Sequence, residues 1–209
     1  QRLRFTTSNP HDFTHDIADC FKHIPKLGSY LHLAVQSGSN DQLKRMKRKV
    51  TREEFFEKVD YLKSANPSFA ISTDIIVGFP GETDEDFEQT LDLVRPTNLS
   101  FAYTFKYSPR KNTAAARFTD QVEESIKDQR LAKLNKLLDQ LTIQHNTSEI
   151  GHQREVLFLY ESRKEPNIYY GRTPEYRLAR VYSTDNLTGQ TRIIKVKGAN
   201  KTALSGELI

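Results

Sequence analysis

Short apolar runs alternate with amphipathic segments along the first two thirds of the chain. Runs at 3–6, 30–35, 71–77 and 101–107 are typical of strands, and the run at 71–77 predicts a strand buried on both faces. Between the runs, apolar residues recur at helical spacing, and a longer amphipathic stretch predicts a helix over 120–145. Strands and helices that alternate in this way indicate an α/β fold with a parallel sheet, here the later part of a (β/α) barrel.

The pattern changes after Gly151. Short alternating runs at 154–160, 177–182 and 191–196, and a last one near Leu204, are separated by segments rich in turn residues. Four or five short strands in about sixty residues predict a small antiparallel barrel of the kind that binds oligonucleotides. We therefore predict an α/β domain over residues 1–147 and an all-β domain over residues 148–209.

The stretch from Ser72 to Thr83 combines a strand, a glycine turn and a helix start. The strand runs into Gly78, and Thr83 then caps a helix whose first turn is acidic. In α/β folds this corner lies beyond the carboxyl ends of the strands, where ligands bind. On the pattern alone a purely structural corner is the favoured interpretation, and a ligand-binding corner stays open beside it. Asp74 is the only charge inside the strand and needs a partner there.

The net charge of +4 lies in the all-β region, which holds ten Lys and Arg against six Asp and Glu after residue 150. Tyrosines interleave with these basic residues, and bases stack on aromatic rings while cations hold phosphates. The region therefore favours RNA binding, and an ordinary basic surface is the alternative. The candidate RNA-binding residues there are Arg163, Lys164, Tyr170, Arg172, Arg177 and Arg180.

The single cysteine, Cys20, excludes an internal disulfide and favours a reducing, cytoplasmic setting. It lies on an apolar helical stripe, which predicts a buried, inert thiol. His11 and His15 are four residues apart, but no acidic or cysteine partner set accompanies them, so we predict no metal site. No apolar run reaches the length of a membrane span, and we expect no membrane partner.

Several stretches, in order along nearly the whole chain, resemble the MiaB-type methylthiotransferases, which are radical-SAM enzymes. The matching stretches are FTTSNP at 5–10, LAVQSGS at 33–39, MKR at 46–48, TREE at 51–54, STDIIVGFPGET at 72–83, FKYSPR at 105–110 and TAA at 113–115. The all-β region resembles the TRAM domain, an OB-like RNA-binding barrel, through GRT at 171–173 and LSGE at 204–207. The resemblance implies the C-terminal part of a radical-SAM partial barrel followed by a TRAM domain.

The resemblance also implies a reaction. The complete enzyme adds a methylthio group to carbon 2 of N6-isopentenyladenosine beside the tRNA anticodon, as a cytoplasmic monomer that binds the anticodon stem-loop. It uses S-adenosyl-L-methionine and two 4Fe-4S clusters, one of them held by a Cys-x3-Cys-x2-Cys motif. Neither set of cluster cysteines is present here, and Cys20 matches neither. We therefore expect this chain to bind no cluster and to be inactive alone.

The resemblance assigns a set of residues to the cofactor but none to catalysis. Arg48 meets the cofactor carboxylate or the RNA backbone, and Arg110 is a further RNA-binding candidate. The spacing from Gly78 to Glu82 departs by one from the looser superfamily pattern. The implied cofactor-binding residues are Gln36, Ser37, Ser39, Asp74, Ile76, Gly78, Tyr107 and Ser108.

Two alternatives to the tRNA enzyme stay open. The first is the related branch that methylthiolates an aspartate of a small-subunit ribosomal protein. The motif at 36–39 and the basic tail look more like the tRNA branch. The second is a short chain that binds RNA and catalyses nothing, which the missing cysteines would also fit.

Overall fold

Three parallel strands form the central sheet of the computed structural model, which describes residues 2–4, 9–97 and 99–209. They are β1 (Tyr30–His32), β2 (Ala70–Val77) and β3 (Phe101–Lys106), in the order β1-β2-β3. The predicted parallel sheet is thus confirmed, although β1 is shorter than the expected 30–35. Most of the resemblance at 5–10 and half of the expected strand at 3–6 fall on residues 5–8, outside the described residues.

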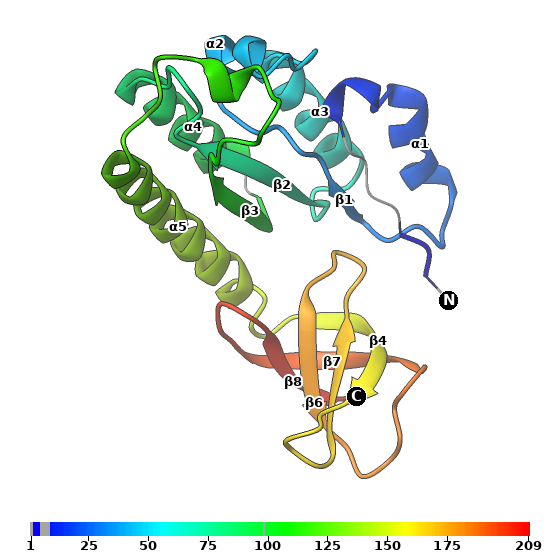
Figure 1. Ribbon diagram of the computed structural model, residues 1–209. Helices are drawn as coiled ribbons and strands as arrows, with labels where there is room; N and C mark the ends of the chain where they lie inside the picture. Colours follow the sequence, from blue (N-terminus) through cyan, green and yellow to red (C-terminus); the bar gives the residue numbers. More distant parts are fainter. Residues whose placement is uncertain (1, 5–8, 98) are drawn as a thin grey trace.

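Helices cover one face of this sheet (Figure 1). Apolar residues of β2 such as Ile71 and Ile75 are fully buried against them, together with Phe55 of α3 and Leu91 of α4. The opposite face is open, since Tyr103 on β3 is 55% exposed. The expectation that β2 is buried on both faces holds for its first half, where Ala70 and Ser72 are buried on the second face, whereas Asp74 and Ile76 farther along that face are only partly buried. These helices are α1 (His15–His23), α2 (Asn40–Arg45), α3 (Arg52–Ala65) and α4 (Asp84–Thr97).

Side-chain caps fix where these helices begin. Thr51 and Glu54 form a capping box at the start of α3. Thr83 caps α4, since its hydroxyl accepts from the Asp86 amide at 3.1 Å. The α2 cap is Ser39, since its hydroxyl accepts from the Gln42 amide and helical geometry begins at Asn40.

A single long helix, α5 (Glu124–Thr147), leads from the sheet to the second part of the chain (Figure 1). It begins four residues after the expected start at 120. Two 3₁₀ turns, η1 (Pro10–Asp12) and η2 (Ala115–Arg117), complete the helical elements of the described residues. None of the helices in these residues is long and apolar enough to cross a bilayer.

The last sixty residues form a closed barrel in the order β4-β5-β6-β8-β7. Phe158, Ile194 and Val196 are fully buried at its centre. The strand β5 was not among the predicted runs, because it follows directly on a turn. The expectation of a wholly antiparallel barrel was wrong, since β6 and β8 pair in parallel. The strands are β4 (Gln153–Glu161), β5 (Ile168–Arg172), β6 (Leu178–Tyr182), β7 (Thr191–Ala199) and β8 (Leu204–Leu208).

The turn between β5 and β6 docks the barrel against the amino end of the sheet. The Tyr176 ring stacks on Tyr30 of β1 with 4.6 Å between ring centroids. The Arg2 guanidinium donates to the Arg172 backbone carbonyl at 2.8 Å, and Arg4 donates to that of Thr173 at 2.9 Å. These contacts hold the barrel against the end of the sheet where β1 begins.

Candidate functional site

The backbone of Gln36 extends the sheet beyond the carboxyl end of β1. Its amide donates to the Asp74 carbonyl at 2.9 Å, and its carbonyl accepts from the Ile76 amide at 2.9 Å. Gln36 has a φ of 80°, which costs about 1–3 kcal/mol for a residue other than glycine. A strained residue at a strand end, held by two backbone hydrogen bonds, is a candidate ligand contact.

Hydrogen bonds hold the three residues after Gln36 against α4. The Gly38 amide donates to the Thr90 hydroxyl at 3.0 Å, and the Ser39 hydroxyl donates to the Asp86 carboxylate at 2.5 Å. Burial alone would raise the pKa of Asp86, but hydrogen bonds from Ser39, Thr83 and Gln42 lower it overall. Ser37 and Ser39 therefore use their hydroxyls in hydrogen bonds that hold this loop in place. Their contact with a cofactor remains a prediction.

Two residues of α5, Lys127 and Arg130, contact the turn that follows β2. The Gly78 amide donates to the buried Glu82 carboxylate at 2.8 Å, and Arg130 pairs with the same carboxylate oxygen at 2.7 Å. Burial raises the pKa of Glu82, although Gly78 and Arg130 act in the opposite direction. Gly78 has a φ of 71°, and an added Cβ would overlap the Lys127 side chain. The Gly78 amide is thus engaged within the protein.

A cavity of about 430 Å³ lies beside these strand ends. It brings together three of the predicted residues, Gln36, Arg48 and Ile76. Its walls combine basic side chains with apolar ones, which suits a ligand that has an apolar portion and an anionic group. The other residues that line it are Arg45, Met46, Lys47, Phe79, Ala114, Ala115 and Phe118.

Arg48 differs from the other basic residues of this cavity because its side chain is half-buried and lacks a partner in the described part of the chain, whereas Lys47 is exposed and Arg45 is paired. Among the described residues, none makes a hydrogen bond or ion pair with its half-buried guanidinium. Burial lowers the pKa of Arg48, and the nearby charge of Asp74 opposes that shift. Arg45 is engaged instead, since it pairs with Asp120 at 2.6 Å. A partly desolvated guanidinium without a partner favours an anionic ligand such as a carboxylate.

The remaining predicted cofactor residues lie around this cavity without lining it. Asp74 lies on the open face of the sheet, 3.4 Å from the His32 ring nitrogen, which supplies the partner expected for it. The Tyr107 ring packs edge-on against Phe79 with centroids 5.0 Å apart. The Tyr107 hydroxyl is buried and has no hydrogen-bond partner in the described part of the chain. Ser108 is exposed.

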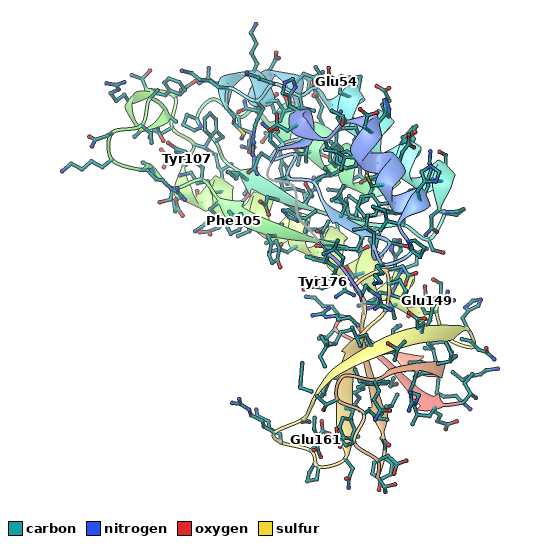
Figure 2. All side chains as sticks on the ribbon, turned by 90° about the vertical axis from the view of Figure 1, so that its right-hand side faces the viewer. Glu54, Phe105, Tyr107, Glu149, Glu161 and Tyr176 are labelled. Carbon is teal, nitrogen blue, oxygen red and sulfur yellow. The ribbon has the colours of Figure 1, made fainter. Side chains whose placement is uncertain are left out.

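The predicted RNA-binding residues divide into two groups. On the barrel, Tyr170 stacks on Tyr160 with ring centroids 5.6 Å apart, and Arg163, Lys164 and Arg180 are exposed. We call these five residues the tyrosine surface. In Figure 2, Tyr176 lies where the two parts of the chain meet, and Tyr107 lies in the α/β part.

The second group is engaged at the junction between the sheet and the barrel. Arg172 donates to the Tyr176 carbonyl at 2.8 Å, and Arg177 donates to the Asn146 side chain at 2.8 Å. Arg110 belongs to neither group and is exposed in the loop after β3. The roles of all these residues in RNA binding remain predictions.

Sequence reasoning missed the far wall of the cavity. Ala114, Ala115 and Phe118 come from an irregular segment with no helical or strand period. Cys20 is only half-buried, and its thiol donates to the Asp16 carbonyl at 3.4 Å, so the expected burial is partial. Within residues 2–4, 9–97 and 99–209, no group of three or more His, Cys, Asp or Glu is placed to hold a metal ion.

Comparisons with known proteins give a consistent picture. Residues 2–94 match the Radical SAM superfamily. The chain is 43% identical over 210 residues to the tRNA-2-methylthio-N(6)-dimethylallyladenosine synthase of Rickettsia conorii, covering 100% of this chain and 47% of that protein. It is 42% identical over 208 residues to the synthase of the same name from Bacillus cereus, covering 41% of it. The chain thus spans about half the length of the curated relatives it matches.

Among solved structures, coproporphyrinogen III oxidase (HemN) from Escherichia coli, described as a radical SAM enzyme, has a TM-score of 0.55 to this chain. The two are 16% identical, and the match covers 80% of this chain and 45% of that one. At this identity the likeness shows the fold alone. Together with the match of residues 2–94 to the Radical SAM superfamily, it supports the predicted α/β architecture of the radical-SAM type. The structure also contains a closed five-stranded barrel.

Proposed function

We propose that this chain, a relative of the MiaB-type tRNA methylthiotransferases, is the part of such an enzyme that holds S-adenosyl-L-methionine and grips tRNA. The complete enzyme modifies carbon 2 of N6-isopentenyladenosine beside the anticodon, as a monomer in the cytoplasm. The relatives at 43% and 42% identity are named for this reaction on tRNA, which favours tRNA over a ribosomal protein as substrate.

The unpartnered Arg48 in the cavity beside Gln36 and Ile76 is the observation that supports the cofactor site. The residues fit S-adenosyl-L-methionine: the guanidinium pairs with the carboxylate, and the apolar wall of Ile76 and Phe79 contacts the adenosyl group. When bound together with a 4Fe-4S cluster, the cofactor supplies the radical chemistry. Cys20 is the only cysteine here, so the cluster cysteines belong to parts of the enzyme outside this sequence, and the chain alone is inactive.

The barrel carries the RNA-binding half of the proposal. We assign residues 1–147 to the radical-SAM domain and residues 148–209 to a TRAM domain. The tyrosine surface supports this assignment, since the Tyr160–Tyr170 stack is exposed and flanked by three basic side chains. Exposed aromatic rings beside cations suit single-stranded RNA, such as the loop of an anticodon stem-loop.

Calorimetric titration of this chain with two related ligands tests the cofactor site. S-adenosyl-L-methionine carries a carboxylate, whereas 5′-methylthioadenosine has the adenosyl group without the amino acid. We expect Arg48→Gln to weaken binding of the first about tenfold, as for loss of a charged hydrogen bond, and to leave the second unchanged. Arg95→Gln, on the exposed end of α4, is the matched control.

The outcome separates the possible explanations. If Arg48→Gln weakened both ligands equally, the guanidinium would not meet the carboxylate, and this assignment would be wrong. If the unmodified chain bound neither ligand, the cavity would not be a cofactor site.

A further inference from the structure

Two basic segments, 44–49 and 110–117, are far apart in the sequence but meet at the carboxyl end of the sheet (Figure 1). Arg45 joins them. Its guanidinium pairs with Asp120, just beyond the second segment, at 2.6 Å and lies 5.1 Å from the centroid of the Phe118 ring. Both segments contribute residues to the wall of the proposed cofactor cavity. The fold therefore gathers two separate runs of positive charge beside that cavity.

Most of these cations are exposed and have no carboxylate partner. The first segment contains five Lys and Arg and the second contains three, and neither contains Asp or Glu. Arg45 is paired, and Arg48 lies half-buried in the cavity wall. The other six are exposed, and within residues 2–4, 9–97 and 99–209 none of their side chains forms a hydrogen bond or ion pair. We call these six residues the basic rim: Lys44, Lys47, Lys49, Arg110, Lys111 and Arg117.

Other exposed cations of the α/β part are paired. Lys22 pairs with Asp19 at 2.7 Å, and Lys133 pairs with Glu88. A paired cation on a surface contributes little to the binding of an anion, because its charge is already compensated. The basic rim differs from this arrangement and leaves its positive charge available to a ligand.

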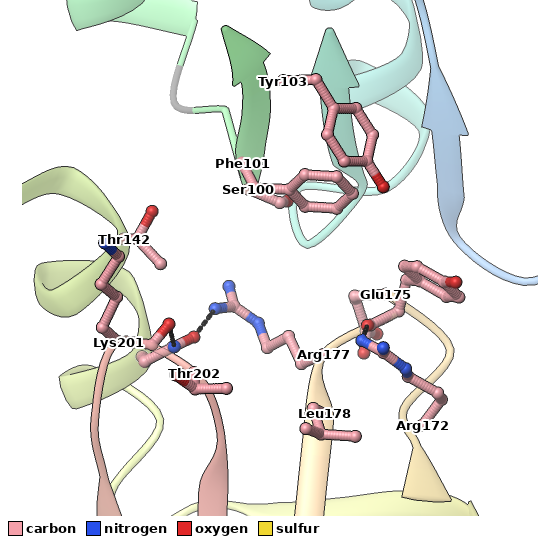
Figure 3. Close-up of a pocket in the computed structure, with 12 residues that line it drawn as sticks. Ser100, Phe101, Tyr103, Thr142, Arg172, Glu175, Arg177, Leu178, Lys201 and Thr202 are labelled. Carbon is pink, nitrogen blue, oxygen red and sulfur yellow. Dashed lines mark hydrogen bonds between the residues drawn. The ribbon is translucent and has the colours of Figure 1, made fainter. Parts of the chain in front are cut away.

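The cations at the opposite end of the sheet show the contrast (Figure 3). Arg177 and Lys201 line a cavity of about 280 Å³ where the barrel meets the sheet. Arg177 donates to the Asn146 side chain at 2.8 Å, and Lys201 pairs with Asp139 at 2.6 Å. These cations hold the barrel in place and are occupied within the protein, whereas those of the basic rim are not.

The dipole of α2 accounts for only part of the basic rim. Lys44 lies in the last turn of α2, where the dipole favours a cation. This effect falls off within the last turn, so it does not extend to the segment 110–117. Lys47 follows the helix with a φ of 57°, a conformation at which helices end by preference on glycine, and its side chain lines the cavity. A lysine at such a position favours a role for its charge.

We propose that the basic rim binds the phosphate backbone of the RNA beside the cofactor cavity, as a second contact that is separate from the tyrosine surface. Phosphates are spaced along an RNA strand, so one strand can meet cations of both segments, whereas a free phosphate can meet only a few of them. Phosphate contacts fix the position of a nucleic acid and carry no sequence information. The basic rim thus positions the RNA over the cavity whatever its sequence. This inference rests on the proposed function only in that RNA is the substrate.

Fluorescence anisotropy of the full chain with a labelled anticodon stem-loop RNA, at several KCl concentrations, tests the basic rim. The logarithm of the binding constant falls linearly with the logarithm of the salt concentration, with a slope of about −0.7 to −0.9 for each phosphate contact. We expect the double variant Lys47→Gln with Arg117→Gln to lower the magnitude of this slope by about 1–2. Affinity at low salt should fall about tenfold.

A matched control removes two charges elsewhere. Lys26 precedes β1 at the opposite end of the sheet, and Lys136 lies in the middle of α5. Both are exposed, and in the described part of the chain neither side chain has an ion-pair partner. The double variant Lys26→Gln with Lys136→Gln should therefore keep the slope of the unmodified chain.

Two further comparisons separate charge from shape and backbone from base. Lys47→Arg with Arg117→Lys keeps both charges and should retain the slope. Tyr170→Ala should lower affinity and also retain the slope, because a stacked base releases no counterions. The rim variant should weaken two stem-loops of different loop sequence by the same factor.

The results distinguish the possible partners. Equal slopes for the rim variant and its control would overturn the basic rim and leave the proposed function intact. Displacement of the RNA by inorganic phosphate, beyond that by KCl of equal ionic strength, would indicate a site for a single phosphate and overturn the backbone contact. Tighter binding to phosphatidylserine vesicles than to RNA, lost in the rim variant, would assign the rim to a membrane surface instead. Failure of the unmodified chain to bind any RNA would overturn the proposed function together with the rim.

Discussion

Replacing Arg130 by methionine tests whether α5 holds the turn at the carboxyl end of β2. Arg130 is 6% exposed and forms ion pairs with Glu82 at 2.7 Å and Asp84 at 2.8 Å. It also donates to the Glu82 carbonyl at 3.1 Å. Methionine keeps much of the side-chain volume but removes the charge and every donor.

The expected loss follows from what the substitution leaves behind. Glu82, also 6% exposed, would keep only the hydrogen bond from the Gly78 amide for its buried carboxylate. Breaking a buried pair by removing one partner costs about 3–5 kcal/mol, because the other charge stays uncompensated. The Asp84 pair adds little, since that carboxylate is exposed. We therefore expect Arg130→Met to lower the free energy of unfolding by about 3–5 kcal/mol at neutral pH.

The loss should depend on pH in a defined direction. Burial already raises the pKa of Glu82 above its unfolded value, and removal of Arg130 raises it further. A carboxyl whose folded pKa is raised favours the folded state below its unfolded pKa and loses this benefit as pH rises through the folded pKa. The Arg130→Met variant should therefore be closer in stability to the unmodified chain at pH 5 than at pH 7.5.

Urea unfolding followed by circular dichroism at both pH values measures the effect. Lys133→Met, on the exposed side of the same helix, is the control and should change stability by less than about 1 kcal/mol. Adding Glu82→Gln to Arg130→Met should recover stability at pH 7.5, because no buried charge remains. Equal losses for the Arg130 and Lys133 variants, or a loss independent of pH, would refute the reasoning.

Two further outcomes follow from single positions. Gly78→Ala should destabilise the chain by about 1–3 kcal/mol in urea unfolding, since its φ is positive and its Cβ would overlap Lys127. Gly189→Ala, with a φ of 78° and open space around its Cβ, should cost less, and equal losses would contradict the steric argument. Tyr170→Ala should weaken oligonucleotide binding by about 1–3 kcal/mol, measured by fluorescence anisotropy, and an unchanged affinity would remove the stacking role.

The corner at the carboxyl end of β2 could be predicted from sequence because its signals are local. The strand, turn and cap from Ser72 to Thr83 are close in sequence, and their geometry follows from glycine, proline and threonine at fixed positions. Asp74 illustrates the limit of such reasoning. Its partner, His32, lies on another strand, and only the parallel register of β1 and β2 brings the two together.

The division of the basic residues could not be predicted, because it depends on how the barrel docks. Arg172 and Arg180 lie on neighbouring strands in the same basic, tyrosine-rich segment, so composition treats them alike. The stack of Tyr176 on Tyr30 places Arg172 at the junction, whereas Arg180 stays exposed. A contact between residues 146 positions apart leaves no periodic signal in either segment.

One strained residue marks the turn through which the barrel docks on the sheet. Tyr176 has a φ of 69°, which a residue without glycine's freedom adopts only when its surroundings hold it. Here Arg4 and Arg172 lie 4.7 Å and 4.3 Å from the centroid of its ring, and Tyr30 stacks on it. Contacts from two strands and from the start of the chain fix the turn that carries Glu175. The orientation of the barrel relative to β1 and β2 is therefore set by specific contacts at this turn.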